Sequence, residues 1–187
     1  MLHRMKKQLP NLLTYSRILV IPALMAVFLF VQGEWKNPIC AALFFFASLT
    51  DFFDGYLARA WHAHSNLGRF LDPIADKLLV ATALMLLVKA QRADILPALL
   101  ILCREILVSG LREFLADLRI SVPVSTLAKY KTAAQMVAIF LLLLGTSAPG
   151  FVNVQEAGGL LLWLAAFLTL VTGYAYLKTG LKHLAAG

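Results

Sequence analysis

Residues 48–77, SLTDFFDGYLARAWHAHSNLGRFLDPIADK, place four aspartates between two long apolar stretches of the chain. Asp51, Asp54, Asp72 and Asp76 are four of only ten acidic residues in the whole sequence. A carboxylate in apolar surroundings is costly unless it is paired or binds a metal. This stretch therefore indicates a functional site between two helices that are otherwise hydrophobic.

The rest of the chain is strongly apolar. Of its 187 residues 60% are hydrophobic and 14% are charged, and the mean hydropathy is +0.79. Six apolar segments, separated by short polar turns, are each close to the length that crosses a bilayer. They are residues 12–32, 38–58, 72–90, 95–116, 126–146 and 157–177. The sequence predicts an all-α integral membrane protein with six transmembrane helices, folded as a single domain over residues 1–187.

The positive charges predict how these helices are oriented. With a cytoplasmic N-terminus, fourteen of the 17 lysines and arginines fall on the inner side, and Lys36, Lys89 and Arg92 fall on the outer side. This bias predicts that both termini are cytoplasmic, in the cytoplasmic (inner) membrane of the cell. The net charge of +7 is then explained by orientation and by anionic membrane lipids, so we expect no nucleic-acid partner.

Many inner-side charges lie a turn or two inside the apolar segments. Snorkelling explains single lysines and arginines near helix ends, but the short aspartate side chains cannot reach far. The group predicts a polar cavity open to the cytoplasm. Its members are Arg17, Asp51, Asp54, Asp72, Asp76, Lys77, Arg104, Glu105, Arg112, Lys129 and Lys131.

The spacing of the aspartates gives two carboxylates on one face of each helix. Asp51 and Asp54 are three residues apart, and Asp72 and Asp76 are four apart. Carboxylates this close repel one another, so either some are protonated or a divalent cation holds them together. Oxygen ligands of this kind favour Mg²⁺ or Mn²⁺ over softer metals.

Small and basic residues flank the aspartates. Gly55 and Ala58 leave one helix face bare enough for a ligand, although these two residues taken alone are better explained by a helix-packing groove. Arg59, one turn on, suits a phosphate group. Gly68 is expected to begin the third helix, where Pro73 fits either a first-turn proline or a local kink.

Taken together, Asp51-x-x-Asp54-Gly55-x-x-Ala58-Arg59, eight residues, then Gly68-x-x-x-Asp72-x-x-x-Asp76 resembles the signature of the CDP-alcohol phosphotransferase family at all eight positions. The resemblance implies a six-helix membrane enzyme, usually a homodimer. Such an enzyme transfers a phosphatidyl group from CDP-diacylglycerol to an alcohol and releases CMP.

The resemblance also implies roles for individual residues. Asp51, Asp54 and Asp72 would hold two divalent cations, and Asp76 would contact one of them and act as the general base. The residues implied to contact CDP-diacylglycerol or to line its pocket are Thr14, Arg17, Gly55, Ala58, Arg59, Ser65 and Gly68.

The alcohol acceptor has to be inferred from other residues. Arg104, Arg112, Lys129 and Lys131 lie at the inner ends of the fourth and fifth segments, and such a cation cluster suits a phosphorylated acceptor. Lys129 and Lys131 are two residues apart and point differently, so which of them reaches the pocket stays open. Glu105 and Glu113 each follow one of the two arginines, and their simplest role is charge balance or a structural pair.

Three further stretches resemble the branch of the family that uses glycerol phosphate: NLLTYSRI (11–18), REILVSGLREF (104–114) and KYKT (129–132) followed by Gln135 and Met136. The cations and this resemblance together predict sn-glycerol 3-phosphate as the acceptor.

Two alternatives remain at this stage. The same fold can use another acceptor, either inositol phosphate or, as in a cardiolipin synthase, phosphatidylglycerol. A divalent-cation transporter would also place carboxylates on facing helices. Against transport, the outer halves of the predicted spans contain no acidic path across the membrane.

Overall fold

The structure, a computed structural model, describes residues 2–61, 66–118, 120, 126–147 and 153–184. The described residues form six α-helices and one short 3₁₀ helix, with no strand among them. Their bounds are α1 Leu2–Phe30, α2 Lys36–Trp61, α3 Asn66–Lys89, α4 Ile95–Asp117, α5 Thr126–Leu144, the 3₁₀ helix Gly145–Ser147 and α6 Val154–Leu184. The predicted number and order of helices are confirmed.

Several helices are longer than their apolar segments. The α1 helix begins at Leu2, and α6 continues to Leu184, because helical hydrogen bonding continues into polar sequence that hydropathy does not mark. The α3 helix begins at Asn66, slightly before the expected Gly68. Pro73 is therefore inside α3 and not in its first turn. Proline has no N–H, so the regular hydrogen bond to the carbonyl four residues earlier is absent there.

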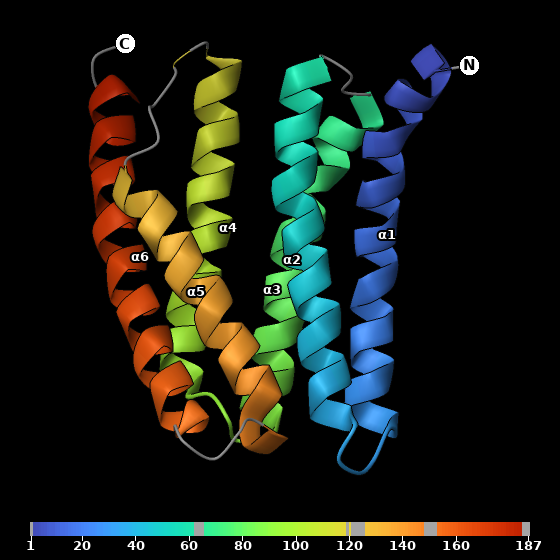
Figure 1. Cartoon of the computed structure of the whole chain (residues 1–187). Coiled ribbons are helices and arrows are strands. Elements are labelled where there is room, and N and C mark those ends of the chain that lie inside the picture. The colour runs from blue at the N-terminus through green and yellow to red at the C-terminus, as the bar shows by residue number, and fades with distance from the viewer. Residues whose placement is uncertain (1, 62–65, 119, 121–125, 148–152, 185–187) are drawn as a thin grey trace.

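The helices run alternately up and down, so both termini lie at one end of the bundle (Figure 1). We call this the terminus end; it holds the starts of α1, α3 and α5 and the ends of α2, α4 and α6. The other is the opposite end. The α1 helix packs against α2 and α3, and α6 packs against α4 and α5. Contacts between α2 and α5 join the two groups.

The continuous hydrophobic core fills the opposite-end half of the bundle. Its residues come from the second halves of α1, α3 and α5 and the first halves of α2, α4 and α6. Alanines within it let the helix backbones approach closely. Representative members are Leu24, Phe28, Ala41, Phe44, Leu79, Ala83, Leu84, Ala98, Ile101, Ala138, Ile139, Leu142, Leu162 and Ala165. Toward the terminus end, the buried residues that the structure describes include Arg17, Lys131 and Gln135 beside apolar ones such as Val108 and Leu115.

Hydrogen bonds close the opposite end. Arg92, in the turn after α3, donates from Nη1 to Asn37 Oδ1 at 2.9 Å and to the carbonyl of Leu143 at 3.4 Å. Gln155 Nε2 donates to the Arg92 carbonyl at 2.6 Å. We call these four residues the Arg92 cluster. It ties the start of α2, the end of α5 and the start of α6 to the turn between α3 and α4.

The outer surface of the described helices is largely apolar. By length and composition, α5 and residues 154–178 of α6 are suited to cross a membrane, and α1 holds a shorter apolar stretch, Tyr15–Phe30. Large side chains such as Phe30, Ile106 and Leu160 are exposed, each by 70% or more. Exposed apolar surface on this scale is unusual for a protein surrounded by water.

Candidate active site

The two aspartate pairs are carried by the hairpin of α2 and α3 at the terminus end. Asp54 lies seven residues before the end of α2, and Asp72 lies six residues after the start of α3. Asp51 and Asp76 each lie ten residues from those helix ends. Counted along the two helices, each aspartate of α2 is about as far from its helix end as its counterpart in α3, since each residue adds about 1.5 Å. The two pairs thus lie on consecutive helices, each pair about two to three turns from the end of its helix that adjoins the connection.

Arg17 of α1 lies beside this hairpin. Its guanidinium is buried, and its Nη1 is 4.0 Å from Asp72 Oδ1, while the Asp72 side chain is 35% exposed. A buried cation next to a partly exposed carboxylate lowers the cost of keeping both charged. Arg17 therefore joins α1 to the aspartate region.

Asp72 and Asp76 are the aspartates of the motif whose side chains the structure describes, and both are half-buried. Among the described side chains, no three His, Cys, Asp or Glu gather as metal ligands, but Asp51 and Asp54 lie outside that set. The donors that are present, carboxylates four residues apart on one helix face, have the chemistry that Mg²⁺ or Mn²⁺ requires. The residues fit a divalent metal.

The other residues predicted to contact the lipid substrate are only partly described. Gly55, Ala58 and Arg59 lie in the last turns of α2, Thr14 in α1 and Gly68 in α3, with side-chain surroundings outside the described set. Ser65 itself lies outside the described residues.

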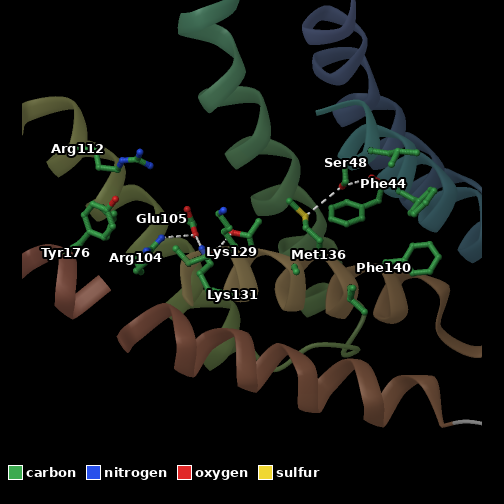
Figure 2. A pocket seen from close by; sticks show the side chains of 17 residues that line it. Phe44, Ser48, Arg104, Glu105, Arg112, Lys129, Lys131, Met136, Phe140 and Tyr176 are labelled. Carbon is green, nitrogen blue, oxygen red and sulfur yellow. Dashed lines mark hydrogen bonds and ion pairs between the residues drawn. The ribbon is translucent and has the colours of Figure 1, made fainter. Parts of the chain in front are cut away.

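A larger cavity, of about 850 Å³, lies between α2, α4, α5 and α6 (Figure 2). All four cations predicted for the acceptor line it: Arg104, Arg112, Lys129 and Lys131. Lys131 is buried, whereas Lys129 is exposed at the rim. Both lysines thus reach this cavity, which the sequence left undecided.

Glu105 balances part of this positive charge. It accepts an ion-paired hydrogen bond from Lys131 Nζ, and Arg104 Nη1 lies 3.3 Å from the same carboxylate oxygen (Figure 2). These contacts agree with both roles expected of Glu105, charge balance and a structural pair. With four cations against this one carboxylate, the lining keeps an excess of positive charge suited to an anion.

The α6 helix contributes residues that the sequence analysis missed. Thr172 Oγ1 accepts a hydrogen bond from Arg104 Nη2 at 3.2 Å, and the Arg112 guanidinium lies 5.8 Å from the centre of the Tyr176 ring. At Gly173 an added Cβ would be 3.0 Å from Arg104 Cγ, so glycine lets α6 approach this arginine closely. The spacing of Thr169, Thr172 and Tyr176, one polar stripe on an apolar helix, is the signal that would have found them.

The same cavity has an apolar side formed by α2 and α5. Phe44, Phe45 and Leu49 of α2 lie along it, together with Val137 and Phe140 of α5 (Figure 2). A cavity that is cationic on one side and aromatic or aliphatic on the other suits an amphiphile with a phosphate group.

A second cavity, of about 160 Å³, adjoins the first. Asp76 lines it, and Glu105, Lys131, Thr132 and Met136 line both cavities. The carboxylate predicted to act as a base is therefore close to the predicted acceptor cations, although they come from different parts of the chain. Their proximity results from the packing of α3, α4 and α5.

Two buried polar atoms near these cavities have no hydrogen-bond partner among the described residues. They are Arg104 Nε and Gln135 Oε1. Buried polar atoms are nearly always paired in folded proteins, and the exceptions are expected at functional or strained sites.

Paired carboxylates beside a cation-lined, half-apolar cavity define a helical protein that handles phosphorylated, lipid-like substrates. The chain belongs to the CDP-alcohol phosphatidyltransferase family, whose model matches residues 7–171. The predicted family is confirmed.

Similar proteins carry a more specific name, CDP-diacylglycerol--glycerol-3-phosphate 3-phosphatidyltransferase. The protein of that name from Rickettsia felis is 48% identical over 180 residues, which cover 96% of this chain and 99% of the relative. The one from Rickettsia prowazekii is 50% identical, covering 94% of this chain and 96% of the relative. A third, from Salmonella choleraesuis, is 42% identical, with 93% and 95% covered.

Proposed function

We propose that this chain transfers a phosphatidyl group from CDP-diacylglycerol to sn-glycerol 3-phosphate, giving phosphatidylglycerol phosphate and CMP. Relatives named for this reaction match the chain over nearly its full length. The structural observation that carries the proposal is that Arg104, Arg112, Lys129 and Lys131 line one cavity, next to the cavity of Asp76. A serine or choline acceptor would not need four cations.

The enzyme acts within a membrane. In the most apolar stretches of α5 and α6 only 33% and 39% of residues are buried, whereas the core helix of a water-soluble protein would be mostly buried. Six spans, with the terminus end and both termini in the cytoplasm, follow from the alternating helices and the positive-inside bias. Residues 1–187 then form one domain in the cytoplasmic membrane, and its cavities face the cytoplasm.

The lipid substrate binds on the side of α1, α2 and α3. The residues that contact its CDP group or line the pocket are Thr14, Arg17, Gly55, Ala58, Arg59, Ser65 and Gly68. Two divalent cations, Mg²⁺ or Mn²⁺, would be held by Asp51, Asp54, Asp72 and Asp76. When bound, they supply positive charge that offsets the pyrophosphate and the departing CMP. Arg17 orients the Asp72 carboxylate toward this site from α1.

Asp76 acts as the general base. Its half-buried carboxylate lines the smaller cavity, where it accepts the proton of the 1-hydroxyl of glycerol 3-phosphate. The hydroxyl oxygen forms a bond to the β-phosphorus of CDP-diacylglycerol as the bond from that phosphorus to the CMP oxygen breaks.

The cations hold the acceptor phosphate. Lys131 and Arg104 lie deepest and are linked through Glu105, so their positions are fixed before the acceptor arrives. A preorganised cation does not have to be ordered by the substrate, which lowers the entropic cost of binding.

An acceptor screen tests this function. The purified protein is supplied with CDP-diacylglycerol, Mg²⁺ or Mn²⁺ and one acceptor at a time, and released CMP is measured. Glycerol 3-phosphate should give by far the fastest release, and no release is expected without divalent metal. Faster release with inositol phosphate or phosphatidylglycerol would contradict the proposed acceptor.

Topology and assembly need separate measurements. Cysteine-accessibility labelling in intact cells should find both termini on the cytoplasmic side, and a terminus labelled from outside would contradict the proposed orientation.

The enzyme is proposed to be a homodimer, so mass measurement in detergent should give twice the mass of one chain plus detergent.

A further inference from the structure

Gln135 of α5 is buried in a way that needs an explanation. It is 3% exposed, and its Oε1 has no hydrogen-bond partner among the described residues. A buried amide oxygen left without a donor destabilises the fold, so such atoms are rare in proteins. Replacement by an apolar side chain would remove the cost, which indicates that the amide has a use.

The position of Gln135 points to the acceptor. It lies four residues after Lys131, so the two side chains share one face of α5. Gln135, Lys131 and Asp76 all line the cavity of about 160 Å³. A space of this size fits a small polar molecule better than a lipid chain, since one water occupies about 30 Å³ in the liquid.

The donors that line this cavity are already engaged. Lys77 Nζ donates to Ser109 Oγ, and Lys131 Nζ donates to Glu105. Thr132 Oγ1 donates to the Ala128 carbonyl at 3.0 Å. None of these donors bonds to Gln135 Oε1 in the described part of the chain, so a molecule that enters the cavity can supply the missing hydrogen bond.

We infer that Gln135 accepts a hydrogen bond from the 2-hydroxyl of sn-glycerol 3-phosphate and so contributes to acceptor selection. This inference rests on the proposed function. The acceptor has three polar groups in a row, and the cavity lining offers a match for each. Asp76 takes the 1-hydroxyl, the cations beside Lys131 take the phosphate, and Gln135 takes the hydroxyl between them.

The consequence is selection against acceptors that lack this hydroxyl. A site built to bond a substrate hydroxyl rejects an analogue without it, because the buried polar group of the protein then stays unpaired. The cations alone would hold any small alkyl phosphate. Gln135 adds a requirement for the hydroxyl on the middle carbon.

The test compares two acceptors, sn-glycerol 3-phosphate and 3-hydroxypropyl phosphate, which lacks the 2-hydroxyl. With the wild-type enzyme, kcat/KM should be about 10- to 100-fold higher for glycerol 3-phosphate. In Gln135→Met, kcat/KM for glycerol 3-phosphate should fall by most of this factor. The value for 3-hydroxypropyl phosphate should change by less than about twofold, because that acceptor never made the bond.

Gln155→Met is the matched control, since Gln155 is bonded to the Arg92 carbonyl at the opposite end and should keep the wild-type preference. Equal use of both acceptors by the wild-type enzyme would overturn the inference even if Gln135→Met does not fold. An equal loss for both acceptors in Gln135→Met would make Gln135 a purely structural residue and would also overturn it. Failure of the proposed function itself would look different, because the wild-type enzyme would then release no CMP with glycerol 3-phosphate.

Discussion

Arg92 and Arg104 are both half-buried arginines in the same bundle, yet their surroundings differ. Arg92, at the opposite end, donates to Asn37 and to the Leu143 carbonyl, and its own carbonyl accepts from Gln155. Arg104, toward the terminus end, bonds Thr172 and Glu105 but has a buried Nε without a partner among the described residues.

The difference separates polar groups that serve folding from polar groups that serve binding. Polar atoms in the Arg92 cluster are satisfied by hydrogen bonds to helix ends and turns, and none of these residues lines either of the two cavities described above. Around Arg104 and Gln135 the chain keeps unpaired polar atoms and open space, both of which reduce stability. Proteins tolerate such costs where a ligand completes the site.

The largest expected effect is at Asp76. Asp76→Asn keeps the shape of the side chain but removes its ability to accept a proton, so kcat should fall by about 10²- to 10⁴-fold. CMP release under saturating substrates measures this. Binding of CDP-diacylglycerol should be much less affected, and a variant with near wild-type kcat would exclude Asp76 as the base.

The next effect is on acceptor binding through Arg104. Arg104→Gln should raise the KM for glycerol 3-phosphate by about 10- to 100-fold, because a charged hydrogen bond to phosphate is lost. The KM for CDP-diacylglycerol should change less. Steady-state kinetics with each substrate varied in turn measures both, and equal increases would indicate a structural role.

A change at the opposite end should affect stability only. Gly145 has a φ of +53°, and an added Cβ would lie 2.8 Å from Arg92 Nη1. Gly145→Ala should therefore lower the free energy of unfolding by about 1–2 kcal/mol, with both KM values unchanged. Thermal unfolding in detergent measures the loss.

Gly159→Ala in α6 is the matched control for that variant. An added Cβ there meets nothing within 4 Å, and alanine is the better helix former, so stability should not fall. Equal losses in the two variants would contradict the assigned role of Gly145.

The smallest expected effect concerns Lys129. Its side chain is exposed at the rim of the larger cavity, and exposed charges are screened by solvent. Lys129→Gln should raise the KM for glycerol 3-phosphate by about two- to fivefold at low salt, and by less at high salt. A tenfold or greater increase that is independent of salt would show that Lys129 binds the phosphate directly.

The sequence predicts much of the fold because helices of this kind are encoded locally. Six apolar segments predict the six helices in their observed order, and the spacing of Asp72 and Asp76 places them on one helix face. Helix ends are predicted less well. Asn66 begins α3 before the apolar segment does, because hydropathy reports the bilayer and not the extent of helical hydrogen bonding.

The site is predictable where residue type and spacing carry the chemistry. Charge and position predict the four cations of the acceptor site, and all four line one cavity. Contacts between distant helices could not be read in this way. The pairing of Lys131 with Glu105 and of Arg104 with Thr172 depends on how α4, α5 and α6 pack, and the unpaired oxygen of Gln135 can be recognised only from the structure.

Arg104→Gln and Arg92→Gln, measured side by side, test the division between the two ends most directly. The same substitution is made in two half-buried arginines, and the acceptor KM and the unfolding temperature are determined for both. Arg104→Gln should raise the KM for glycerol 3-phosphate at least tenfold. It should change the unfolding temperature by less than Arg92→Gln does. Arg92→Gln should leave this KM within about twofold and lower the free energy of unfolding by about 1–3 kcal/mol. An Arg92→Gln enzyme with an acceptor KM as high as that of Arg104→Gln would contradict the account.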